Sequence, residues 1–133
     1  MFRIKHCREI VLKILYQIDI LQISDSEDAQ IIENYFQSFR AVNPDEEQFI
    51  RNMIQQIHEK RGEIDRLISE NLIGWKMNRL SPINRSLLRM GIAESHFNDQ
   101  KAVIIDDIIR IAQKYGDQDD YKFINAILDK VIP

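Results

Sequence analysis

The chain has 133 residues, of which 44% are hydrophobic and 29% charged, and this length is typical of a single domain, predicted here over residues 1–133. No apolar run approaches the roughly 18 residues of a membrane span, and the charged N-terminus lacks the apolar segment of a signal peptide. A single cysteine cannot form an intramolecular disulfide, so we expect a cytoplasmic protein, while the net charge of −3 argues weakly against a nucleic-acid partner.

Apolar residues recur at helical spacing along most of the chain, without the alternation of a strand, so we predict an all-α protein of about seven helices. The first helix is expected from about residue 3 to residue 21, with Cys7 on its apolar stripe as a small buried side chain rather than a nucleophile. Ser26 should cap a second helix, whose last apolar residue is Phe39. Asn43 and Pro44 are a strong signal for the next helix start, because a cap and a first-turn proline precede three acids.

The second half of the chain continues this helical pattern. Gly62 marks an expected break, after which a shorter amphipathic segment follows. Ser81 and Pro82 should open the next helix, and apolar residues from 103 to 115 predict the sixth.

The C-terminal segment joins a helix end, a short acidic turn and a last helix. Gly116 is expected to end the sixth helix in the left-handed conformation, and Asp119 or Asp120 to cap the seventh. The apolar stripe of the last helix places Lys122 on its opposite side, with Phe123 on the flank, neither clearly core nor clearly solvent.

Charged residues are segregated along the chain. Residues 24–47 hold seven acids and only Arg40, whereas residues 72–93 hold no acid and four basic residues, Lys76, Arg79, Arg85 and Arg89. Arg85 and Arg89 are one helical turn apart and should share a face, as should Lys5 and Arg8. Such a local basic surface on an acidic protein suits one defined phosphate backbone, although charged helix faces are often only solvated surface. For Arg79, close to the expected cap, a structural ion pair is an alternative explanation.

Catalytic and metal-binding patterns are missing from the sequence. The three histidines lie on separate segments, and there is no paired cysteine and no glycine-rich phosphate loop. Asp106 and Asp107 are helix neighbours that point about 100° apart, so we interpret them as helix surface rather than as an acid-base pair. The prediction is a binding protein, not an enzyme, without catalytic residues, metal or cofactor.

Three motifs follow one another along the chain. The first helix reads R-E-x-x-L-x-x-L-Y-Q-x-D from Arg8, and the C-terminal segment reads YG-x-x-D-x-x-KF-x-N-x-x-LDK followed by a hydrophobic residue. Between them, Trp75 to Glu94 is similar to W-x-x-x-RL-x-x-x-[DE]R-x-x-LR-x-x-x-x-E. Together the three resemble the NusB family of bacterial transcription antitermination factors, over almost the whole chain.

The resemblance implies two small helical bundles packed crosswise. Trp75 lies in a connection between helices and is interpreted as a packing anchor between the bundles rather than as a base platform. It also implies a factor that binds the boxA element of nascent ribosomal RNA leader transcripts together with a small ribosomal-subunit protein, Nus factor E. This pair would act in the RNA polymerase antitermination complex and support processive rRNA transcription. No membrane partner is expected, and both a monomer and a homodimer of the free protein stay open. By motif position, the implied RNA-binding residues are Lys5, Arg8, Arg89, Lys122 and Phe123. The implied residues for the ribosomal protein are Tyr16 and Asn84.

Two alternatives from other classes stay open at this point. One is an RNA-positioning module like that of certain RNA cytosine methyltransferases, which the short chain argues against; the other is a helical protein adaptor without an RNA role. Tyr16 also has an alternative to a partner contact, since it could simply cover the edge of the bundle. Phe123 is expected to be a base-stacking platform that contributes little to stability. Asn84 replaces the acid usual in the family, so Asn84→Asp is expected to tighten the protein complex.

Overall fold

The computed structural model describes residues 1–22, 28–38, 42–74, 76–117 and 119–133. Within them the chain forms seven α-helices, one short 3-10 helix and no strand, which confirms the all-α prediction. The elements are α1 (Ile4–Leu21), α2 (Asp28–Ser38), α3 (Pro44–Glu59), α4 (Arg61–Glu70), η1 (Met77–Arg79), α5 (Pro82–Ser95), α6 (Lys101–Tyr115) and α7 (Asp120–Val131). No helix of the described residues is long and apolar enough to cross a membrane.

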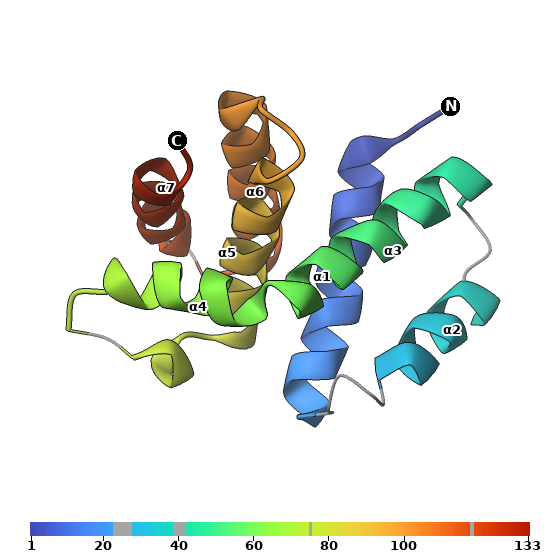
Figure 1. The fold of residues 1–133 in the computed structure, drawn as a ribbon, viewed down its shortest axis with the longest axis horizontal. Helices are drawn as coiled ribbons and strands as arrows, with labels where there is room; N and C mark the ends of the chain where they lie inside the picture. Colours follow the sequence, from blue (N-terminus) through green and yellow to red (C-terminus); the bar gives the residue numbers. More distant parts are fainter. Residues whose placement is uncertain (23–27, 39–41, 75, 118) are drawn as a thin grey trace.

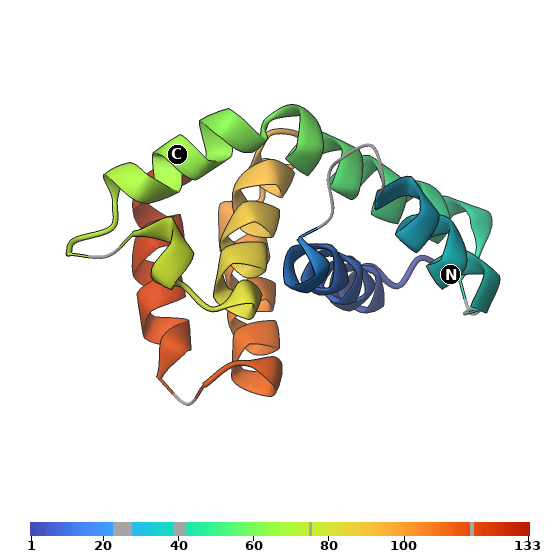
Figure 2. The same cartoon turned by 90° about the horizontal axis from the view of Figure 1, so that it is seen from below.

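The helices form two groups, α1–α3 and α4–α7, joined where α3 and α4 run nearly end to end across the molecule (Figure 1). Figure 2 looks almost along α1, whereas α5 and α7 lie across the same view, so the two groups cross as expected. The central helix is α5, which packs against α1, α3, α4, α6 and α7. Five of its apolar residues are accordingly at most 1% exposed: Leu87, Leu88, Met90, Ile92 and Ala93.

Two of the predicted helix starts are confirmed by their hydrogen bonds. Asn43 Oδ1 accepts a hydrogen bond from the Glu46 backbone N–H at 2.9 Å, and Glu46 Oε1 accepts one from the Asn43 N–H at 3.0 Å, which completes a capping box. Ser81 Oγ accepts from the Asn84 N–H at 3.1 Å. These bonds satisfy amide groups that have no partner within the helix.

Glu46 also ties the first residues of the chain to the start of α3. Its carboxylate accepts hydrogen bonds from the backbone N, Nε and Nη2 of Arg3 at 2.9, 2.9 and 3.0 Å. Hydrogen bonds from Arg3 and from the Asn43 N–H lower the pKa of Glu46 to about 2. The charge of Arg3 is therefore compensated within the protein, although its side chain is partly exposed.

Three local expectations were wrong. The break between α3 and α4 falls at Lys60, where φ is −110° and ψ is 14°, and Gly62 lies in the first turn of α4. Gly116 is extended, with φ of −94° and ψ of −177°, rather than left-handed. Glycine is needed there because an added Cβ would stand 2.8 Å from the carbonyl oxygen of Ala112. Asp119 precedes α7 but makes no side-chain cap hydrogen bond. The expected roles of Ser26, Phe39 and Trp75 lie outside the described residues.

Candidate nucleic-acid and partner interface

Lys122 and Phe123 stand next to each other in the first turn of α7. The Lys122 side chain is 68% exposed, and its Nζ lies 3.9 Å from Oδ1 of Asp119 and 5.9 Å from the centre of the Tyr121 ring. Phe123 is half-buried, because it packs against the hydrophobic core and also lines an open hollow of about 390 Å³. The expected flank position of Phe123 therefore agrees with the structure, but its packing against the core corrects the expectation that it contributes little to stability.

The hollow beside Phe123 is walled by the start of α5 and by the turn between α6 and α7. Its other lining residues are Arg79, Leu80, Ser81, Asn84, Asp117 and Asp120. Arg79 is exposed and also lines a neighbouring hollow of about 470 Å³ with Lys76. Arg79 has no ion pair among the described residues, which excludes there the alternative of a structural ion-pair partner. The basic run of residues 72–93 indicated both cations, but not the position of Arg79 beside Phe123.

Lys5 and Arg8 lie one turn apart on α1 in very different surroundings. Lys5 is exposed. Arg8 is only 1% exposed, because its guanidinium is enclosed by two carboxylates. Nε and Nη2 donate to the Glu94 carboxylate at 2.8 and 2.6 Å, and Nη1 donates to Asp107 Oδ2 at 3.0 Å. Burial alone would lower the pKa of Arg8, but hydrogen bonds with Glu94 and Asp107 raise it above its ordinary value.

This buried triad of Arg8, Glu94 and Asp107 corrects two expectations. The basic face that Lys5 and Arg8 were expected to share does not exist, since Arg8 points into the protein. Asp107 was interpreted as helix surface but is only 4% exposed. The signal for burial was present in the spacing, because Asp107 falls on the apolar stripe of α6 between Ile104 and Ile111. A charge on such a stripe indicates a buried ion pair.

A second charge cluster extends the triad along α6. Glu9 accepts hydrogen bonds from Lys114 Nζ at 2.7 Å, from the Tyr115 hydroxyl at 2.8 Å and from Arg110 Nη1 at 3.0 Å. Burial alone would raise the pKa of Glu9, but these hydrogen bonds lower it to about 2. Several charges of α1 are thus used to hold α1 against α6 rather than to meet a ligand.

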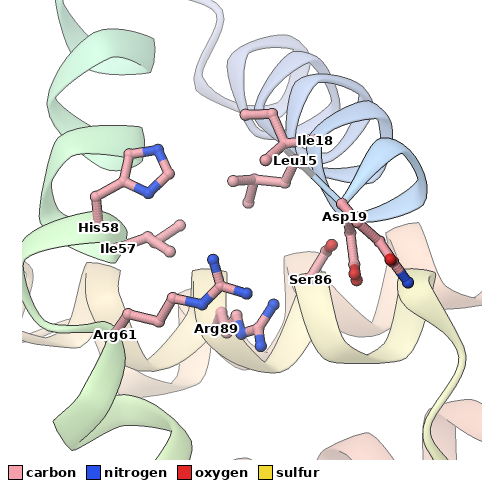
Figure 3. Close-up of a pocket in the computed structure, with 9 residues that line it drawn as sticks. Leu15, Ile18, Asp19, Ile57, His58, Arg61, Ser86 and Arg89 are labelled. Atoms are coloured by element: carbon pink, nitrogen blue, oxygen red, sulfur yellow. The ribbon is translucent and has the colours of Figure 1, made fainter. Parts of the chain in front are cut away.

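Arg89 faces a different part of the molecule from Lys122. It is 8% exposed, and its Nε and Nη2 donate to the two carboxylate oxygens of Asp65 at 2.9 and 3.1 Å. Its side chain points into a cavity between α1, the α3–α4 junction and α5 (Figure 3). The structure therefore does not bring Arg8 or Arg89 together with Lys122 and Phe123. Nor do Arg85 and Arg89 form one exposed basic face, since Arg85 pairs with Asp19 at 3.0 Å.

The two residues predicted to face a protein partner lie on either side of the first turn of α5. Tyr16 is 40% exposed and lines a mostly apolar hollow of about 560 Å³ together with Tyr35, Val42, Ile83 and Tyr115. The next residue after Ile83 is Asn84, which lines the hollow of Phe123 instead. A partner that covers both hollows would have to span the start of α5.

Asn84 is largely enclosed, with only 6% of its surface exposed. Its Nδ2 donates to Asp120 Oδ2 at 3.0 Å, and its Oδ1 makes no hydrogen bond within the described residues. A carboxylate at position 84 would meet the carboxylate of Asp120. The expectation that Asn84→Asp improves a contact therefore loses its basis, because the side chain first contacts α7.

The surface around Phe123 combines three kinds of group that suit a single-stranded nucleic acid. A half-exposed aromatic ring can stack on a base, and the cations Arg79 and Lys122 can hold phosphates. The carboxylate of Asp119, 80% exposed, and that of Asp117 can accept hydrogen bonds from the exocyclic amino groups of bases. Among the described residues, no group of three or more histidine, cysteine or acidic side chains could hold a metal ion.

A family model described as the NusB family matches residues 5–133 of the chain. Among similar proteins are two called transcription antitermination protein NusB. The one from Ruminiclostridium cellulolyticum is 34% identical over 126 residues, which are 93% of this chain and 84% of the relative. The one from Syntrophomonas wolfei subsp. wolfei is 33% identical over 130 residues, which are 96% of this chain and 94% of the relative.

Solved structures of similar fold agree with this match. T. maritima NusB has a TM-score of 0.89 and 32% sequence identity, over 99% of this chain and 92% of that chain. A structure of the antitermination factors NusB and NusE in complex with dsRNA has a TM-score of 0.85 over 96% of this chain and 94% of that one. Its identity of 23% makes it a likeness of fold alone.

Proposed function

Since this chain belongs to the NusB family of transcription antitermination proteins, we propose that it binds the boxA element of nascent ribosomal RNA leader transcripts. In this proposal the whole chain is one RNA-binding domain in the cytoplasm. It joins a small ribosomal-subunit protein, Nus factor E, and the RNA polymerase antitermination complex, and so supports processive rRNA transcription. The relatives carry the name of antitermination proteins, which favours this role over an RNA methyltransferase module.

The RNA proposal rests mainly on the position of Phe123 close to exposed cations. Phe123 is held by the core on one side and open to a hollow on the other, so it is a rigid platform that loses little entropy when a base stacks on it. Lys122 and Arg79 flank this platform from two elements. Lys5 on α1 is a further exposed cation and remains in the proposal as a phosphate contact.

Arg8 and Arg89 enter the proposal differently. Both are already engaged with carboxylates: moving the Arg8 guanidinium to RNA would leave the enclosed Glu94 without its cation, and moving Arg89 would break its two hydrogen bonds to Asp65. We therefore propose that Arg8 acts indirectly, by fixing α1 so that Lys5 and Tyr16 are correctly presented.

The RNA proposal is tested by the salt dependence of binding to a single-stranded boxA RNA. Lys122→Ala should weaken binding and reduce the slope of log K against log salt by about 0.7, the value for one phosphate contact on a single strand. The matched control is Lys130→Ala, which removes an exposed lysine from the other end of α7 and should leave the slope unchanged. Equal slopes for both variants and the wild type would refute the assignment of Lys122.

The protein partner is proposed to dock on the apolar hollow of Tyr16. An exposed tyrosine beside an apolar hollow is typical of a contact residue, because the ring adds buried area and the hydroxyl can still bond water or the partner. Tyr16→Ala should lower the affinity for the ribosomal protein, measured by calorimetry, at least tenfold, or about 1.4 kcal/mol. The control is Ile20→Ala, since Ile20 is an exposed apolar residue of α1 outside this hollow.

A further inference from the structure

The cavity that Arg89 faces has a volume of about 280 Å³ and lies between the two helical groups, apart from the hollows of Phe123 and Tyr16. It is bounded by the end of α1, the α3–α4 junction and α5 (Figure 3). The lining residues are Leu15, Ile18, Asp19, Gln22, Ile57, His58, Arg61, Ser86 and Arg89. Its volume is just below the range of roughly 300 to 1,000 Å³ for small-molecule sites, and it exceeds the roughly 30 Å³ that one water occupies. The cavity therefore has room for a small polar ligand.

Two guanidinium groups point into this cavity from adjacent elements. In Figure 3 the side chain of Arg61, from α4, lies next to that of Arg89, from α5. Both approach the same carboxylate: Arg89 makes two hydrogen bonds to Asp65 at 2.9 and 3.1 Å, and Arg61 Nε lies 3.9 Å from Asp65 Oδ2. Asp65 orients the two cations and holds them side by side.

Two hydrogen-bond donors at the cavity remain unused by the described residues. Ser86 is only 1% exposed, lines the cavity and makes no hydrogen bond with another described residue. Arg89 uses Nε and Nη2 for Asp65, which leaves Nη1 without a hydrogen-bond partner in the described parts of the chain. Enclosed polar groups are nearly always hydrogen-bonded, to protein or to ordered water, and a ligand with acceptor atoms can take the place of that water.

The other charged groups that face the cavity already have partners. Asp19 accepts hydrogen bonds from Arg85 at 3.0 and 3.2 Å, so its carboxylate is compensated from α5. His58 contacts the carboxylate of Asp28. Asp19 and His58 are thus engaged with neighbouring side chains, whereas the two unused donors, on Ser86 and Arg89, belong to α5.

We propose that this cavity binds an oxyanion of the phosphate class, held by Arg61, Ser86 and Arg89. A tetrahedral oxyanion offers several acceptors, which matches donors that converge from two helices, and guanidinium groups recognise such anions through parallel N–H groups. The bound anion would bridge the α3–α4 junction and the central helix α5. The proposal concerns a site separate from the Phe123 surface and does not rest on the RNA function.

The experiment is a calorimetric and thermal-unfolding titration with inorganic phosphate at constant ionic strength. The wild type should bind one phosphate per chain, and Ser86→Ala and Arg61→Gln should each weaken this binding about tenfold, as expected for a hydrogen bond to a charged ligand. The matched control is Arg66→Gln, because Arg66 is also on α4 but pairs with Glu70 at the surface. It should bind phosphate like the wild type.

A second titration, with single-stranded RNA, identifies the source of the phosphate group. If the cavity takes a backbone phosphate, Ser86→Ala and Arg61→Gln also weaken RNA binding, and free phosphate competes with RNA more than chloride does. If it takes free phosphate, RNA affinity is the same in all variants. Phosphate can stabilise any protein by being excluded from its surface, and this effect is equal in every variant. Equal phosphate responses in all four proteins, with equal RNA affinities, would overturn the proposal.

Discussion

Replacing Arg8 by methionine should destabilise the protein strongly without an equal loss of RNA affinity. The substitution keeps most of the apolar stem but removes three charge-assisted hydrogen bonds, of 2.6, 2.8 and 3.0 Å, to Glu94 and Asp107. Glu94, only 1% exposed, then remains enclosed without its cation, whereas Asp107 keeps the hydrogen bond that Arg110 Nε donates at 2.6 Å. Breaking a buried ion pair by removing one partner costs about 3 to 5 kcal/mol.

This loss is large against the total stability of about 5 to 15 kcal/mol of an ordinary domain. At about 4 °C for each kcal/mol, the melting midpoint should fall by on the order of 10 to 20 °C. Urea unfolding gives the free energy, and RNA titration well below the midpoint gives the affinity of the folded variant. The matched control is Lys5→Met, one turn earlier on α1, where the side chain is exposed. It should leave the midpoint nearly unchanged and weaken RNA binding instead.

A rescue separates the ion pair from other effects of the substitution. Adding Glu94→Gln to Arg8→Met removes the uncompensated charge and should recover part of the lost stability. An Arg8→Met variant that melts like the wild type but binds RNA more weakly would refute this reasoning, because it would mean that Arg8 leaves its carboxylates to contact RNA.

Phe123→Ala should lower stability by roughly 2 kcal/mol, about half the value for a fully buried ring, because Phe123 is half-buried. It should also lower RNA affinity by roughly 1 to 3 kcal/mol. Thermal melts and RNA titrations of one sample measure both, and undiminished RNA affinity would exclude the stacking role. Asn84→Asp should destabilise by about 1 to 3 kcal/mol, since it sets a carboxylate against Asp120, and a more stable variant in urea unfolding would contradict this. Because Glu46 has its pKa lowered from 4.5 to about 2, its stabilising effect is present above pH 4.5 and is lost as the pH falls through about 2. Arg3→Ala should reduce this acid dependence in pH-dependent melts, and an unchanged profile would count against the pair.

Local features of the fold were predictable because they depend on neighbouring residues. The apolar stripe of α1 and the caps at Asn43 and Ser81 involve side chains within a few residues of one another. The crosswise arrangement came only from the resemblance to a family, because helical periodicity defines which face is buried but not which faces meet.

Charged residues were predicted less well, because their roles depend on partners far along the chain. Arg8 lies 86 residues from Glu94, and Arg89 lies 24 residues from Asp65, so neither pairing follows from local spacing. Both arginines fit an RNA surface as well as an ion pair when only charge and motif position are considered. Lys122 and Phe123 were placed correctly on their helix because the stripe of α7 leaves them beside it. Their closeness to Arg79 depends on how α7 packs beside α5.

The buried triad of Arg8, Glu94 and Asp107 can form only after most of the chain has been synthesised. Arg8 leaves the ribosome first, but its partner Asp107 lies 99 residues later. At about 5 to 20 residues per second, the nascent chain keeps α1 without this partner for about 5 to 20 seconds. A buried face with a cation near its start is more soluble during that wait than a wholly apolar one, because the guanidinium stays hydrated. The same charge that holds the finished protein together thus protects its first helix from premature association while the rest of the chain is made.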